Sequence, residues 1–338
     1  MRTGGSAPPH LTPILVAAAL SLPGVSLCAA ATMSLATETD AAGIRIGRDL
    51  AEFVAPAAGV QLEVLATPGP AESVRRLRSG GDVKLATAAS DGEQAFLVRA
   101  ARDDAAAGKS MPLLRVVVPL YSEEIYFIAR ADAPFAYLHE IKDAKINTGP
   151  PRSGTAETIG AVYRRMFGKP LAERQVSVLP HEDALVKLVT DKSIDVVAVV
   201  AAQPAQLLAN MTPEARQYVR LLKLDREHAA SKAALKAYLP ATVRAASYPA
   251  LLAEDLPALA VRVYLVTLDF RDHATESGLI RLVRSLCQNL ASLQAKGDPK
   301  WQEVDLKLTP LADGLDYYQP TASELRACKP PSPRARPR

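Results

Sequence analysis

Cysteine, aromatic residues and net charge are all scarce in this sequence, and each shortage excludes a class of protein. Three cysteines among 338 residues are too few for a scaffold built on disulfide bonds. Aromatic residues make up 5% of the chain, which argues against a surface on which nucleic-acid bases stack. The formal charge of +4 arises at the two ends, which carry Arg2, Lys329, Arg334, Arg336 and Arg338. The body is close to neutral, so we expect no nucleic-acid partner.

Signatures of catalysis and of metal binding are also missing. No serine stands in a GxSxG turn, and the 5 histidines are scattered without the spacing of metal ligands. The adjacent carboxylates Glu123 and Glu124 fall in an expected strand, where neighbouring side chains point to opposite faces. They are therefore a poor acid–base pair. We predict that the protein is not an enzyme and that it has no cofactor and no metal site.

The first 31 residues have the layout of a secretory signal. Residues 11–31 are apolar and rich in alanine, Pro13 and Pro23 interrupt them, and they close in small residues that suit signal peptidase. We predict a signal peptide over residues 1–31 and a periplasmic location. A retained membrane anchor is the alternative.

The C-terminal part of the expected mature chain contains two cysteines and a tail rich in proline and arginine. Export would allow Cys287 and Cys328 to form a disulfide bond. The alternative is a buried Cys287 and a free Cys328. Residues 329–338, KPPSPRARPR, are rich in proline and arginine, and we expect a disordered basic tail.

Short β-type runs alternate with helical periodicity along the body, which predicts an α/β fold. The expected strands are residues 33–37, 61–66, 83–88, 115–120, 125–129, 145–148, 175–179, 196–200, 220–224 and 259–267. The expected helices are residues 44–54, 156–167, 184–189 and 279–293. A faint repeat of one βαβ unit suggests two similar lobes. We expect the chain to cross between them at residues 116–130 and 221–238, leaving a cleft.

The turn within residues 145–167 is the segment most indicative of chemistry. An expected strand runs into Gly149-Pro150-Pro151-Arg152-Ser153-Gly154-Thr155, and a helix follows. Free amides at a helix start attract anions, and Arg152 could pair with a carboxylate. The segment lacks the lysine of a nucleotide phosphate loop. Two interpretations stay open: a capped helix without a ligand, and an anion-binding turn that faces the cleft. We favour the second.

Several motifs, in order, resemble the TAXI family of solute-binding proteins from tripartite ATP-independent periplasmic (TRAP) transporters. Its strand–PGSGT–helix pattern is similar to Pro150–Thr155, and its LYxE strand is similar to Leu120–Glu123. Further likenesses, over most of residues 33–320, are LATETDAAG from Leu35, TPGPAES from Thr67, the Ser90-Asp91 strand end, DKSIDVVAVVAAQP from Asp191, Tyr248-Pro249 and Leu256–Thr267. The departures include Glu38 and Asp40 in a loop usually rich in glycine, and Arg152 at a position usually glycine.

The resemblance implies a two-lobed type II periplasmic binding protein fold with a ligand cleft between the lobes. The implied lobes are residues 32–119 with 240–328, and residues 120–239. The implied function is capture of a small organic acid, of amino-acid or dicarboxylate type, by a monomer that delivers it to a TRAP membrane permease. The alternative is a ligand-sensing receptor on the same fold. The expected ligand-binding residues are Thr37, Thr39, Thr67, Asp91, Tyr121, Arg152, Ser153, Gly154 and Thr155. Glu38 and Asp40 would repel a carboxylate if they faced the cleft.

Overall fold

The computed structural model describes residue 1 and residues 31–39, 41–90, 113–311 and 314–328. The expected signal peptide up to residue 30, Asp91 and the expected basic tail lie outside these residues. Among the described helices, none is long and apolar enough to cross a membrane.

The strands and helices alternate along the chain, which confirms the predicted α/β class. The strands are β1 (Ala31–Glu38), β2 (Val60–Thr67), β3 (Val83–Ala89), β4 (Leu114–Arg130), β5 (Ile146–Asn147), β6 (Val176–Ser177), β7 (Val196–Ala201), β8 (Val219–Leu221), β9 (Leu239–Val243) and β10 (Leu256–Leu268). The helices are α1 (Ala41–Asp49), α2 (Pro70–Arg78), α4 (Gly154–Phe167), α5 (His181–Val189), α6 (Gln206–Ala209), α7 (Pro213–Arg216), α8 (Ala229–Ala234), α9 (His273–Lys296) and α10 (Gln319–Ala327). Short helical turns occur at Leu50–Val54, Pro56–Ala58, Leu138–Asp143, Glu173–Gln175, Ala245–Ser247 and Pro299–Glu303.

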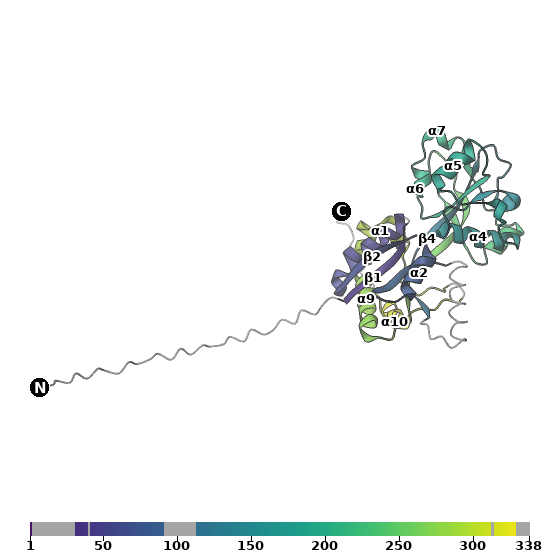
Figure 1. The fold of residues 1–338 in the computed structure, drawn as a ribbon. Helices are drawn as coiled ribbons and strands as arrows, with labels where there is room; N and C mark the ends of the chain where they lie inside the picture. The colour runs from purple at the N-terminus through teal and green to yellow at the C-terminus, as the bar shows by residue number, and fades with distance from the viewer. Residues whose placement is uncertain (2–30, 40, 91–112, 312–313, 329–338) are drawn as a thin grey trace, which may run out of the picture.

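One sheet runs through both lobes of the molecule (Figure 1). Its order is β2-β1-β3-β10-β4-β7-β5-β6, with β8 paired to β4 and β9 paired to β10. In the first lobe β1 is parallel to β2 and β3, and in the second β5 is parallel to β6 and β7. The central strands β10 and β4 are antiparallel to each other. The structure therefore confirms the predicted two-lobed arrangement.

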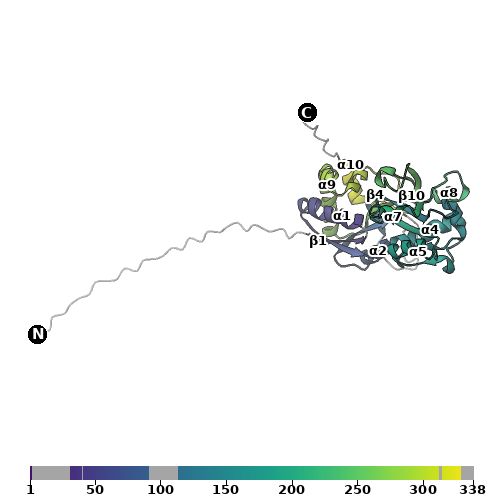
Figure 2. The same ribbon diagram turned by 90° about the horizontal axis from the view of Figure 1, so that it is seen from above.

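Each lobe buries apolar side chains on both faces of its part of the sheet. In the first lobe α1 and α9 cover one face, where Leu35, Ile46 and Leu286 pack together, and α2 covers the other. In the second lobe α4 and α8 cover one face, and α5 and α6 cover the other. Figure 2 shows α1 and α9 in one lobe and α4, α5 and α8 in the other. The apolar runs of the sequence form strands because a strand that is covered on both faces can bury all of its apolar side chains.

The chain crosses between the lobes on two long strands instead of on linkers. β4 is a single strand of 17 residues that joins the two strands expected at residues 115–120 and 125–129. The return crossing is β10, of which Leu259 packs in the second lobe and Leu265 in the first. The segment 221–238, which we expected to cross, instead packs within the second lobe through Leu222, Leu224 and Tyr238.

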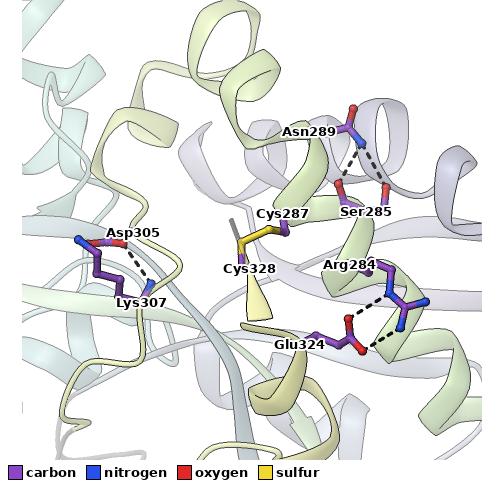
Figure 3. The surroundings of a disulfide bond; sticks show 8 residues. All are labelled: Arg284, Ser285, Cys287, Asn289, Asp305, Lys307, Glu324 and Cys328. Carbon is purple, nitrogen blue, oxygen red and sulfur yellow. Dashed lines mark hydrogen bonds and ion pairs between the residues drawn. A yellow bond between two sulfur atoms is a disulfide. The ribbon is translucent and has the colours of Figure 1, made fainter. Parts of the chain in front are cut away.

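A disulfide bond fastens the end of the described chain to the first lobe. Cys287 on α9 is bonded to Cys328, which directly follows α10, and their Cα atoms are 5.9 Å apart (Figure 3). Arg284 and Glu324 join the same two helices through two hydrogen bonds of 3.0 and 2.8 Å. Of the two alternatives that the sequence left open, the structure adopts the bonded pair.

Candidate functional site

Threonine side chains fix the ends of β1, β2 and β3 in the first lobe. The hydroxyls of Thr37 and Thr87 lie 2.8 Å apart, and those of Thr67 and Ser73 lie 2.7 Å apart. Thr37 and Thr67 are fully buried, whereas Thr39 lies beyond the end of β1 and its amide donates to the Thr67 carbonyl. The hydroxyls of Thr37 and Thr67 therefore hold the strand ends together, and contact of these threonines with a ligand stays a prediction.

The predicted helix start forms in the second lobe at α4. Ser153 has extended backbone, and its Oγ accepts a hydrogen bond from the Ala156 amide at 3.2 Å, so it caps the helix. The Oγ1 atom of Thr155 accepts a hydrogen bond from the Val200 amide at 3.1 Å, which ties the helix start to β7. The two hydroxyls thus orient the first turn of α4, where the amides have no intrahelical acceptor.

A carboxylate from the other lobe occupies this helix start. The amide of Gly154 donates to Oε1 of Glu38, the last residue of β1, at 3.0 Å. The positive end of a helix and a charged acceptor attract each other, so this contact is favourable. The helix start thus binds a carboxylate, and in this structure the carboxylate belongs to the protein itself. From the sequence we expected Glu38 to repel an anionic ligand if it faced the cleft. In the structure the carboxylate of Glu38 does face the turn before α4.

Two glycines allow the lobes to approach this closely. A methyl group on Gly69 would lie 2.6 Å from the carbonyl oxygen of Arg152, and one on Gly154 would lie 2.7 Å from both carboxylate oxygens of Glu38. Contacts this short are not tolerated between heavy atoms. The turn of Gly69 therefore fits against the backbone of Arg152 only because Gly69 has no side chain, whereas a side chain on Gly154 would displace the carboxylate of Glu38.

A narrow cavity lies beside this contact. Its volume is about 10 Å³, and its described lining is Glu38, Pro70, Thr87, Ala88, Ala89, Tyr121, Glu123 and Val263. It has room for about one water molecule in the present arrangement. Tyr121 and Glu123 are 1% and 6% exposed, so β4 buries a ring and a carboxylate at the site. The lobes must separate before a larger molecule can enter.

Arg152 and Asp91 are the two predicted residues that remain to be placed. Arg152 is exposed, its guanidinium forms no ion pair with any described residue, and its φ of 67° lies in the left-handed region. It approaches the other lobe through its backbone carbonyl. Asp91 is outside the described residues. The structure thus brings together Thr39, Tyr121, Ser153, Gly154 and Thr155 around the lobe contact and leaves the charge of Arg152 in solvent.

A second polar cluster joins the lobes behind the cavity, on the opposite face of β4. Glu124 accepts a hydrogen bond from the Gln203 amide at 2.9 Å and lies 3.7 Å from the ammonium of Lys300. Lys300 is 4% exposed and also donates to Glu303 at 2.6 Å and to the Ser122 carbonyl at 2.9 Å. Burial raises the pKa of Glu124 above its usual value, while Lys300 opposes that rise. Glu123 and Glu124 thus face opposite sides, as the strand pattern predicts.

Sequence reasoning did not assign these contacts. Glu38 was judged only as a source of repulsion, although its place one residue from a strand end could have suggested a helix-start acceptor. No local signal pointed to Lys300, which reaches Glu124 across 176 residues of chain. His181 was dismissed as scattered, yet its ring packs where a methyl group on Gly149 would lie, and burial lowers its pKa. Among the described residues, no group of three or more ligating side chains could hold a metal ion.

Comparison with known proteins identifies the family. The model of the NMT1-like family matches residues 40–309. No curated protein matches the sequence.

Three solved structures illustrate the likeness. The periplasmic aliphatic sulphonate binding protein SsuA from Escherichia coli is 14% identical, with a TM-score of 0.43 over 89% of this chain and 84% of that chain. XAC2383 from Xanthomonas citri, bound to chloride ion, is 15% identical, with a TM-score of 0.44 over 88% and 98%. The regulatory domain of CcmR from Synechocystis PCC6803, in complex with 2-PG, is 15% identical, with a TM-score of 0.42 over 75% and 95%. Likenesses this distant do not bear on the ligand of this chain.

The family match extends from the end of β1 through both lobes and beyond the last crossing strand. It includes the helix start of α4 and all residues that line the cavity except Glu38. The chain therefore belongs to the NMT1-like family, a group of type II periplasmic-binding-protein-like chains, and is a solute-binding protein with a ligand-binding cleft between two α/β lobes.

Proposed function

We propose that this protein captures a small organic acid of amino-acid type in the periplasm and delivers it, as a monomer, to a TRAP membrane permease. The observation that carries the ligand class is the hydrogen bond from Gly154 on α4 to the carboxylate of Glu38, beside a cavity lined by Glu123. The start of α4 supplies a position for a carboxylate, and the neighbouring cavity supplies a position for a positive charge.

The charges at the cavity discriminate between the two classes of organic acid considered from the sequence. A carboxylate of the solute takes the first turn of α4, where Ser153, Gly154 and Thr155 orient the amides. A second carboxylate would then face Glu38 and Glu123, and like charges in a narrow cavity repel strongly. An ammonium group in that place is attracted by both residues. An amino-acid type ligand therefore suits the site better than a dicarboxylate.

The energies require closure of both lobes over the solute. A helix start contributes roughly 0.3–2 kcal/mol to the binding of an anion, and a charged hydrogen bond adds about 1.5–3 kcal/mol. Micromolar affinity needs about 8 kcal/mol, so the turn of α4 cannot hold a solute alone. Thr39, Glu38 and Glu123 on the other wall supply the rest. The permease then recognises the arrangement in which the lobes close over a bound solute, which makes binding the trigger of transport.

The order of TAXI-like motifs supports delivery to a permease. Three of these motifs lie at element ends in the structure: LATET ends β1, TPGPAES opens α2 and PPRSGT opens α4. In the structure the last two of these motifs contact each other through Gly69 and Arg152. A permease gene beside this one would favour transport, and a histidine kinase gene would favour the sensing alternative.

The first prediction concerns ligand class and is tested by isothermal titration calorimetry. The mature protein is titrated with L-amino acids, with dicarboxylates such as succinate, and with the corresponding amines. We expect heat from at least one amino acid and at least tenfold weaker binding of the dicarboxylate that matches it in length. The exposed Glu63→Gln on β2 is the control variant and binds as wild type does.

Two results would contradict this proposal. Tighter binding of dicarboxylates than of amino acids removes the assigned ligand class. Absence of heat with every compound argues against small organic acids altogether.

A further inference from the structure

We propose that Glu38 is an internal mimic of the solute: without solute its carboxylate occupies the helix start of α4 and holds the lobes together, and the solute must displace it. The displacement step rests on the proposed function, whereas the latch itself does not. Glu38 is therefore a specificity-determining residue as well as an autoinhibitory contact.

The geometry of the contact is that of a ligand complex. Glu38 and Gly154 are 116 residues apart in sequence, belong to different lobes, and are joined by a hydrogen bond of 3.0 Å. The donor is a helix-start amide and the acceptor is a carboxylate, the pair that an anionic solute would form. Both oxygens of Glu38 lie 2.7 Å from the position that a methyl group on Gly154 would take, so the carboxylate packs closely against the helix start.

The surroundings bring Glu38 to this place. It is the last residue of β1, a strand buried from Met33 to Thr37, so its backbone has little freedom. The amide of Thr39 is tied to the carbonyl of Thr67, which fixes the chain directly after it. Gly69 packs on the carbonyl of Arg152 beside the contact. The first lobe thus presents the carboxylate on a fixed support, and the second lobe meets it with the start of α4.

Displacement explains how one carboxylate can select a ligand. A solute that carries only negative charge must remove Glu38 from the helix start and leave it, together with Glu123, facing an anion. A solute that also carries an ammonium group replaces the lost contact, because the displaced carboxylate pairs with the ammonium. Glu38 therefore disfavours dicarboxylates and favours zwitterions at the same cavity.

The strength of the latch sets the size of the effects. One charge-assisted hydrogen bond at a helix start corresponds to roughly tenfold in an equilibrium constant. We expect the Glu38 contact to shift the balance between closed and open lobes by about that factor. A contact of this size can hold the lobes together and still yield to a solute.

The latch is tested first without any ligand. Small-angle X-ray scattering of the mature protein compares wild type with Glu38→Ala and Glu38→Gln, and Glu63→Gln is the matched control. We expect a larger radius of gyration for Glu38→Ala, an intermediate or unchanged value for Glu38→Gln, whose amide oxygen still accepts a hydrogen bond, and no change for the control. Far-ultraviolet circular dichroism checks that each variant is folded.

Two scattering results overturn the proposal. One is a wild-type radius of gyration as large as that of Glu38→Ala. The other is an unchanged radius in both Glu38 variants. Neither result depends on the identity of the solute, so failure of the latch is distinguishable from failure of the proposed function.

The displacement step is tested with sodium acetate and sodium succinate as probes. The chemical shift of the Gly154 amide, followed by nuclear magnetic resonance, reports occupation of the helix start directly. We expect both probes to bind about tenfold more tightly to Glu38→Ala than to wild type, and equally to wild type and Glu63→Gln. Equal affinity in wild type and Glu38→Ala overturns the proposal, because removal of a competing carboxylate must raise the affinity for the probes.

Discussion

Arg152 has a backbone conformation that few side chains adopt. Its φ of 67° is left-handed, which costs a residue other than glycine about 1–2 kcal/mol. The TAXI-like pattern usually has glycine at this position, and the structure supplies the reason. The turn needs that conformation to bring the Arg152 carbonyl against Gly69, whereas the guanidinium contributes no ion pair with the described residues.

Replacing Arg152 with glycine should therefore stabilise the protein. Part of the gain is lost because glycine makes the unfolded chain more flexible, so the net increase in the free energy of unfolding is about 0.5–1 kcal/mol. Urea denaturation at neutral pH measures it. Lys192→Gly is the comparison variant in the same lobe, since Lys192 has a φ of 56°. It should gain less, because it also loses the ion pair of Lys192 with Asp132 at 3.1 Å. A less stable Arg152→Gly would show that the side chain has a contact worth more than the strain.

The residues of the candidate site were only partly predictable. Ser153, Gly154 and Thr155 were found because a turn followed by a capped helix has a local signature. The partner of Gly154 was not found, because Glu38 reaches it through the folding of two lobes and no spacing in the sequence encodes that approach. The pairing of the Thr37 and Thr67 hydroxyls with Thr87 and Ser73 also has no local signature, and the contact of these threonines with a ligand stays a prediction.

At the scale of elements, the two faces of β4 carry two different groups of polar side chains. Glu123 lines the cavity with Tyr121, whereas Glu124 lies in the polar cluster with Gln203 and Lys300. This cluster gathers β4, the end of β7 and the helical turn Pro299–Glu303 where the lobes join. Arg244, Tyr126, Tyr248 and Glu303 are the other titratable groups that act on Glu124 or on its partners.

The stability of wild type relative to Glu124→Gln should depend on pH. Burial raises the pKa of Glu124 above its ordinary value of 4.5, so the folded state binds this proton more tightly than the unfolded chain does. The resulting stabilisation is fully present below pH 4.5 and is lost as pH rises through the folded-state pKa. We therefore expect the unfolding free energy of wild type, minus that of Glu124→Gln, to increase as pH falls from 7.5 to 5.

Urea denaturation of both proteins at several pH values in that range measures this difference. The other carboxylates titrate in both proteins, so their effects cancel in the subtraction. A difference that decreases as pH falls would contradict the raised pKa of Glu124.

The elements themselves could largely be predicted from the sequence. The apolar runs and helical periodicities gave the α/β class and most strands, because burial on two faces leaves a strong pattern. The return crossing was misplaced to residues 221–238, since a polar connecting segment resembles a linker. Residues 259–267 of β10 were expected as a strand, and Leu256–Thr267, by its resemblance to the TAXI pattern, as part of the region that returns to the first lobe. Its apolar pattern alone does not distinguish a strand that ends in one lobe from one that spans two.

At the scale of the whole molecule, the Cys287–Cys328 bond closes a long loop. The bonded residues are 41 apart in sequence and connect α9 with the residue that follows α10. By loop entropy, such a bond stabilises the folded state by about 4 kcal/mol, and measured values are typically about 2–4 kcal/mol. The bond also agrees with the proposed periplasmic location, where disulfides persist.

Replacing both cysteines with alanine should lower the free energy of unfolding by about 2–4 kcal/mol. The double variant is compared with wild type in urea, each with and without a reducing agent. The reductant should destabilise wild type and leave the variant unchanged. If wild type does not respond to complete reduction, the bond contributes nothing to stability.

The pairing of β4 with β10 determines how the molecule can move. The two crossing strands are hydrogen-bonded neighbours along most of their length, so the connection between the lobes is a two-stranded ribbon. A ribbon of this kind resists stretching and sideways bending far more than it resists torsion. We therefore expect the lobes to separate by torsion of this ribbon, which preserves the backbone pairing of β4 with β10.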